Sequence, residues 1–189
     1  MNNVGEVVWK KCYGGTNNEY ASTIVQTADG GYIFGGHTNS NDGDVINGAQ
    51  SVLDDHNWVV KINGLGIIEW QKYLPISQTG SEIKSIIKVS NNNYVIAGNC
   101  YAGLGNFSYG DIYITQIDEL GNPQLPEPII IGGGYHDYVN TIKQNSDGSF
   151  ILAGVTYSVD NNLSLDFTSN HHAGPFGVGT GDAWVVKLN

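Results

Sequence analysis

The residues that could bind a ligand or a metal ion gather in a few irregular segments of the chain. All five histidines lie in these segments, together with most of the acidic residues and no lysine. Oxygen and imidazole groups without competing cations favour a divalent metal ion or a polyhydroxylated ligand. The candidate ligand-binding residues are His37, Asp54, Asp55, His56, Tyr101, Phe107, Tyr109, His136, Tyr157, His171 and His172.

A possible calcium loop is the weaker prediction. Asn39, Asn41, Asp42 and Asp44 surround Gly43, but the loop lacks the regular alternation and the terminal glutamate of a calcium loop. Clusters of Asn, Asp and Gly are chiefly turn formers. We therefore expect no cofactor, and the alternative is Ca²⁺ bound in this loop. The adjacent histidines in segment 171–172 are expected at a solvated loop tip.

Three acidic residues recur at one apparent position. Glu19, Glu82 and Asp137 each stand five residues before an isoleucine. This recurrence favours a structural role, in which the carboxylate accepts backbone N–H bonds and pins one unit to the next. A catalytic pair would normally be confined to one site. The enzymatic alternative is a carbohydrate hydrolase or lyase with an acid and a base drawn from Asp54, Asp55, Asp137 and Asp166.

These residues must be positioned by a strand pattern that occurs three times. Segments 22–36, 85–98 and 140–154 each read as a strand, a tight turn and a second strand, with Asp-Gly or Asn-Asn at the turn. A third strand follows as NWVVKIN, IYITQID or AWVVKLN, ending at residues 63, 118 and 189. These strands, lettered A, B and C, alternate between apolar and polar positions.

A fourth strand, D, has the pattern VVWKKCY at 7–13 and IIEWQKY at 67–73, with a degraded copy at 128–131. The order D, ABCD, ABCD, ABC predicts β-propeller blades in one all-β domain, 1–189. The repeats span about 14–73, 74–131 and 132–189, and the N-terminal strand 7–13 is offset so that it can complete the last blade.

Three blades are too few for the usual ring of about four to eight. Two chains could make a six-bladed ring, each donating its D strand to the other. The chain could instead be a segment of a longer propeller, and a β-prism of three four-stranded sheets is a further alternative. In the blade topology all B to C connections emerge on one face, which is where function is expected.

Composition excludes several partner classes. The net charge is −10 and the basic residues are eight lysines, without arginine. Such a chain is a poor partner for nucleic acid, and it has no apolar run long enough for membrane insertion or a signal peptide. The two cysteines, Cys12 and Cys100, are expected to be small structural side chains. The tryptophans Trp9, Trp58, Trp70 and Trp184 are expected to pack between blades.

The repeats resemble a known family. Segments 9–15, 29–36, 58–63 and 184–189, with the patterns W-x-K-x-Y-G-G, D-G-G-Y-I-x-x-G and W-V-V-K-[IL]-[ND], look like the repeats of secreted or cell-surface bacterial β-propellers. The second repeat departs from the pattern, and the third lacks the D strand tryptophan. The resemblance implies an extracellular, non-catalytic scaffold. We therefore expect a binding module for a glycan or a protein, with a purely structural repeat as a further alternative.

Overall fold

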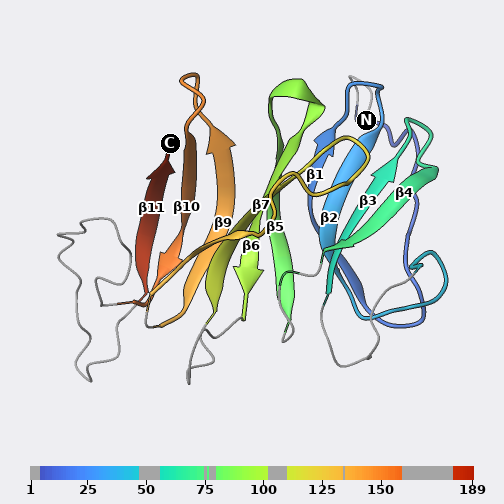
Figure 1. Ribbon diagram of the computed structural model, residues 1–189. Coiled ribbons are helices and arrows are strands. Elements are labelled where there is room, and N and C mark those ends of the chain that lie inside the picture. Colours follow the sequence, from blue (N-terminus) through green and yellow to red (C-terminus); the bar gives the residue numbers. More distant parts are fainter. Residues whose placement is uncertain are drawn as a thin grey trace.

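The chain forms an all-β structure in which the described strands lie in three antiparallel sheets (Figure 1). The structure is a computed structural model that describes residues 5–46, 56–74, 76, 80–101, 110–133, 135–158 and 181–189. The strands are β1 (Glu19–Gln26), β2 (Tyr32–Thr38), β3 (His56–Ile62), β4 (Ile68–Leu74), β5 (Ser81–Lys88), β6 (Tyr94–Cys100), β7 (Asp111–Ile117), β8 (Ile129–Ile131), β9 (Asp137–Gln144), β10 (Phe150–Thr156) and β11 (Asp182–Leu188). One 3-10 turn, η1 (Ser90–Asn92), joins β5 to β6.

Each sheet is built from strands that follow one another in the chain. Sheet 1 has the order β1-β2-β3-β4, sheet 2 has β5-β6-β7-β8, and sheet 3 has β9-β10-β11. The first strands of the sheets are neighbours, because β1 contacts β5 and β5 contacts β9. The three sheets therefore stand in a row, with sheet 2 between the other two (Figure 1).

The hydrophobic core is divided between the faces of the sheets. Ile33 and Val59 of sheet 1 pack against Ile83 of sheet 2 in one buried cluster. Val95 of sheet 2 packs with Trp184 of sheet 3 in a second cluster. The middle sheet is thus covered on both faces, which explains why its strands are apolar at successive positions instead of alternating.

The tight turns lie at one end of the sheets, which we call the turn edge. Asn91 and Asn92 both have positive φ, 58° and 56°, as predicted for a tight hairpin. At the other two hairpins only the glycines have positive φ, with 82° at Gly30 and 87° at Gly148. A type I turn followed by a glycine fits these two connections, which have the same length as the one at Asn91 and Asn92.

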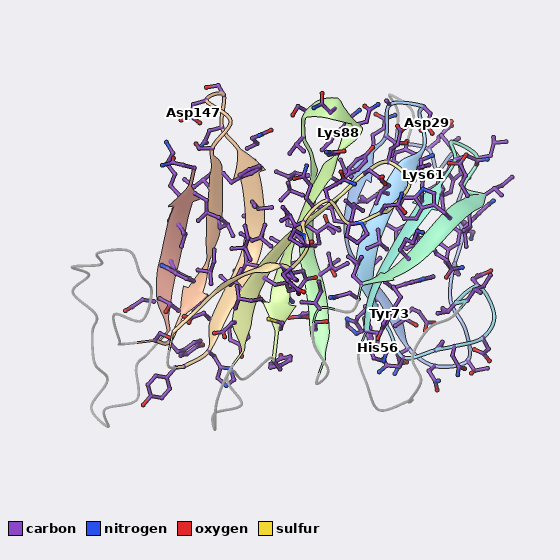
Figure 2. The ribbon with its side chains drawn as sticks, in the orientation of Figure 1. Asp29, His56, Lys61, Tyr73, Lys88 and Asp147 are labelled. Carbon is purple, nitrogen blue, oxygen red and sulfur yellow. The ribbon has the colours of Figure 1, made fainter. Side chains whose placement is uncertain are left out.

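Two of these turns are tied to the third strand of their sheet. Asp29 forms an ion pair with Lys61 at 2.6 Å, and Asp147 forms one with Lys187 at 3.1 Å. Figure 2 shows Asp29, Lys61 and Asp147 at the turn edge. The Lys61 bond is the first of the causes that hold the pKa of Asp29 well below its usual range.

The predicted N-terminal strand at 7–13 is wrong for the described structure, because residues 5–13 are not part of any sheet. Sheet 3 correspondingly has three strands and not four. The predicted packing between sheets holds for Trp184, which is buried against sheet 2, whereas Trp58 is buried among residues of sheet 1 and the segments joined to it, and Trp9 is 40% exposed. Cys100 is buried as expected, but Cys12 is exposed.

Candidate functional site

The connections that were predicted to carry function leave the sheets together at the end opposite the turn edge. We call this end the loop edge. Here the last residue of β2 pairs with the first residue of β3, and the same holds for β6 with β7 and for β10 with β11. Asn57 donates a hydrogen bond to Ser81 across sheets 1 and 2 at 2.8 Å. Asn99 accepts one from the backbone N–H of Val139 across sheets 2 and 3 at 2.9 Å. Three sheet ends thus form one surface.

Four ring side chains meet on this surface between sheets 2 and 3. We call Tyr101, His136, Tyr138 and Tyr157 the aromatic cluster. The rings of His136 and Tyr138 are stacked, with centroids 5.6 Å apart and planes at 9°, and Tyr138 meets Tyr157 edge-on at 6.3 Å. A Cβ at Gly110 would lie 3.3 Å from Tyr101 and 3.4 Å from His136, so this glycine stands between the two rings.

The cluster presents both apolar faces and hydrogen-bonding groups. Tyr101 and Tyr157 are each 38% exposed. The backbone N–H of Gly110 donates to His136 Nδ1 at 2.8 Å, which requires the neutral imidazole with its proton on Nε2. Burial, followed by the neighbouring tyrosines and Glu82, raises the pKa of Tyr138, so its hydroxyl stays protonated at neutral pH.

Two carboxyl groups lie beside the cluster. Asp137 is fully buried, and its Oδ2 accepts bonds from the Gly133 N–H at 2.7 Å and the Ser158 hydroxyl at 2.8 Å. Asp137 Oδ1 and Asp111 Oδ1 are also buried, and neither has a hydrogen-bond partner within the described part of the chain. Burial, and then the charge of Asp137, raises the pKa of Asp111 to about 6. Asp111 can therefore hold a proton at mildly acidic pH.

The recurrent acidic residues are structural at two of the three positions. Glu19 accepts the N–H of Gly15 at 2.9 Å and the hydroxyl of Thr38 at 2.8 Å, which matches the bonds of Asp137. The predicted equivalence of Glu82 is wrong. The strand register places Ser81 opposite the end of β6, where the other two sheets have the acid, and Glu82 is one residue further along.

The proposed calcium loop is joined by hydrogen bonds to the segment that precedes β1. Asp42 Oδ1 accepts the N–H of Thr16 at 2.8 Å and Oδ2 accepts its hydroxyl at 3.0 Å. Asp44 accepts the N–H of Gly14 at 3.2 Å. In the same loop, the backbone carbonyl of Asn39 accepts a hydrogen bond from the side-chain amide of Asn17 at 3.0 Å. These carboxylates hold two segments together, and the calcium site, which included Asn41, stays a prediction.

The remaining predicted residues do not join the aromatic cluster or lie outside the described residues. His37 contacts Tyr20, with ring centroids 4.7 Å apart. His56 is bonded through Nδ1 to the hydroxyl of Tyr73 at the loop edge of sheet 1 (Figure 2). The candidates outside the described residues are Asp54, Asp55, Phe107, Tyr109, Asp166, His171 and His172.

The sequence did not indicate Tyr138, which belongs to β9, or the carboxyl pair of Asp111 and Asp137 as a unit. Within the described ranges, no three His, Cys, Asp or Glu side chains are grouped so that they could hold a metal ion. The same ranges contain no helix with the length and apolar character to cross a membrane. The chain matches no protein-family model, and a search of curated proteins finds no significant match.

Proposed function

We propose that the chain is a non-enzymatic binding module of the β-propeller type that takes a carbohydrate at the aromatic cluster. Each sheet would be one blade, since its strands follow in chain order and its first strand lies nearest the neighbouring sheets. The resemblance to secreted propellers favours a location outside the cell.

The observation that carries the proposal is that the aromatic cluster as a group of four rings is not repeated at the junction of sheets 1 and 2. At the junction of sheets 1 and 2, the pairing registers place Asn39, Gly80 and Glu82 where the cluster has Tyr101, His136 and Tyr138, and only the position of Tyr157 again holds a tyrosine, Tyr101. Side chains that only hold a repeat together are expected to recur, as the Glu19 bonds of sheet 1 and the Asp137 bonds of sheet 3 do. A group of exposed rings at a single junction therefore requires another explanation.

Carbohydrate suits the chemistry of this group. Tyrosine offers an apolar face to the C–H surface of a sugar ring and a hydroxyl to its oxygens. The uncharged His136 adds an Nε2–H donor, and the carboxyl of Asp111 adds an acceptor at neutral pH. The mixture of apolar faces and a few placed polar groups is typical of small-ligand sites.

A glycan array followed by titration calorimetry with the best ligand tests the proposal. Replacing Tyr157 by alanine should weaken binding roughly tenfold, which corresponds to about 1.4 kcal/mol. Tyr20→Ala is the control, because Tyr20 is an exposed tyrosine of sheet 1 that lies outside the aromatic cluster. An array without any binding, or equal losses in both variants, would reject a glycan site at the cluster.

A carbohydrate-active enzyme is the second candidate, and the carboxyl pair favours it. Asp111 with its raised pKa has the property of a general acid, whereas Asp137 is fully buried and bonded to its own sheet. The enzyme would be established if the native chain cleaves the oligosaccharide identified on the array, and if Asp111→Asn still binds this oligosaccharide but no longer cleaves it. If the native chain binds the oligosaccharide without cleaving it, the result supports the binding module and rejects the enzyme.

A further inference from the structure

Strand β4 shows how the fourth strand of one sheet contacts the next sheet. Trp70 donates from its indole N–H to the carbonyl of Glu119 at 3.1 Å, in the turn that precedes β8. In the same turn Gly121 has φ +78°, and a Cβ there would lie 2.8 Å from Lys72 and 2.9 Å from the Trp70 ring. The Trp and Lys side chains of the Trp-x-Lys pattern in β4 thus pack against a glycine of sheet 2.

The N-terminal segment makes the corresponding contact with sheet 1. Gly66 occupies the same turn of sheet 1 with φ +70°, and a Cβ there would lie 3.1 Å from Lys11 and 3.3 Å from the Trp9 ring. Lys11 and Tyr13 both donate to the Gly66 carbonyl, at 2.9 and 2.8 Å. The segment, dark blue in Figure 1, runs on the side of sheet 1 away from sheet 2. It is therefore placed as the fourth strand of a sheet that would precede sheet 1.

In the part of the chain that the structure describes, sheet 3 has no such fourth strand and no segment covers one of its faces. Its last strand, β11, pairs only with β10 among the described residues. Ile33 and Val59 are fully buried in the interface between sheets 1 and 2. Their counterparts in sheet 3, Ile151 and Val185, are 36% and 59% exposed. The face that each earlier sheet buries against the next one is thus open in sheet 3.

We propose that two copies of the chain associate by exchanging these strands. Segment 7–13 of each copy pairs with β11 of the other, and the open face of each sheet 3 packs on the outer face of the other copy's sheet 1. The contact is the same in both directions, as a two-fold interface requires, so six sheets close into one ring. This inference does not depend on the ligand proposed above.

The β3–β4 pairing fixes the register of the exchanged strand. Val59 lies opposite Lys72 in sheet 1. Val185 corresponds to Val59, and Lys11 corresponds to Lys72. Lys11 of one copy should therefore lie opposite Val185 of the other. Adjacent positions in this strand point to the other face, so a shift of one residue separates the two side chains.

Light scattering after gel filtration tests the association. The native chain should elute with twice the single-chain mass of 20.3 kDa. Val185→Asp should return it to the single-chain mass with an unchanged circular dichroism spectrum. Leu120→Asp is the matched control, since Leu120 is 62% exposed on a turn that the interface does not use, and it should stay dimeric. A single-chain mass for the native protein at all concentrations, or an open series of larger masses, would overturn the proposal.

A cross-link tests the register. In a Cys12→Ser background, Lys11→Cys combined with Val185→Cys should give a disulfide-linked dimer on a non-reducing gel, because opposed positions in antiparallel strands meet the geometry of a disulfide. Lys10→Cys combined with Val185→Cys should not. A dimer by mass in which the control pair links and the first pair does not would overturn the strand exchange.

Discussion

Replacing Asp111 by asparagine should stabilise the protein at neutral pH and leave it nearly unchanged at acidic pH. The carboxyl is half-buried, its Oδ1 has no partner among the described residues, and the charge of Asp137 opposes its ionisation. Asparagine has the same shape and no charge. It therefore removes the cost of ionising this group in the folded state.

The magnitude follows from the pKa. The folded-state pKa of about 6 lies roughly two units above the ordinary value of 3.8, and one unit corresponds to about 1.4 kcal/mol. Because the folded pKa is the higher one, the native state holds the proton more tightly. The cost is absent below about pH 4, grows between pH 4 and 6, and is complete above pH 6. With partial exposure to water, we expect Asp111→Asn to gain about 1 to 3 kcal/mol at pH 8.

Urea unfolding followed by tryptophan fluorescence measures this gain at pH 4 and pH 8. Trp58 and Trp184 are buried and will report the transition. All samples need the same protein concentration, because association also contributes to the free energy of unfolding. Glu127→Gln, which removes one charge at an exposed position, controls for the change in net charge. A gain of equal size at both pH values, or a loss that grows with pH, would refute the reasoning.

Two further predictions concern the hairpins. Asp29→Asn should cost about 1 to 3 kcal/mol of unfolding free energy in urea titrations, because Lys61 is largely buried and loses one of its two carboxylate partners, Asp29 and Glu69. Asp147→Asn should cost clearly less, because both partners of that pair are exposed, and equal losses would contradict this. Gly98→Ala should destabilise by about 3 kcal/mol or more, since a Cβ there would overlap a backbone carbonyl of β5 and lie 2.6 Å from a tyrosine ring. Gly148→Ala meets open space and should cost only about 1 kcal/mol for its positive φ, so a thermal melt that ranks the two variants in reverse would disprove the close packing at β6.

The hairpins were predictable from the sequence because their signals are local. Alternating side chains specify a strand, and Asn91-Asn92 or Asp-Gly specifies a turn, within a few residues. The prediction of an N-terminal strand was wrong because a strand also depends on a non-local partner. Segment 7–13 carries the pattern of β4, but a strand exists only where a neighbour offers its N–H and C=O groups. Pattern alone does not say where that neighbour is.

The site was only partly predictable for a related reason. Tyr101, His136 and Tyr157 stood out as aromatic or imidazole side chains in irregular segments, and they lie together. The positions of Tyr138 and Glu82 could not be predicted in this way, because they depend on the register between neighbouring strands. Ile86 and Ile87 are adjacent in the second hairpin, and the strand register matches Ile24 with Ile86. Counting five residues back from Ile87 instead shifts the acid by one place. A shift of one residue exchanges the two faces of a strand.

The two proposals together predict a bivalent receptor. In a two-fold ring the symmetry axis is the ring axis, so both aromatic clusters would open on the same face. A surface that carries many copies of the glycan could then engage both, and apparent affinity would exceed that of one site by about 10² to 10⁴. Val185→Asp should therefore weaken binding to a glycan-coated sensor surface but leave calorimetric affinity for the free sugar unchanged. If both affinities fall together, the variant has damaged the site itself; if neither falls, the clusters do not act as a pair.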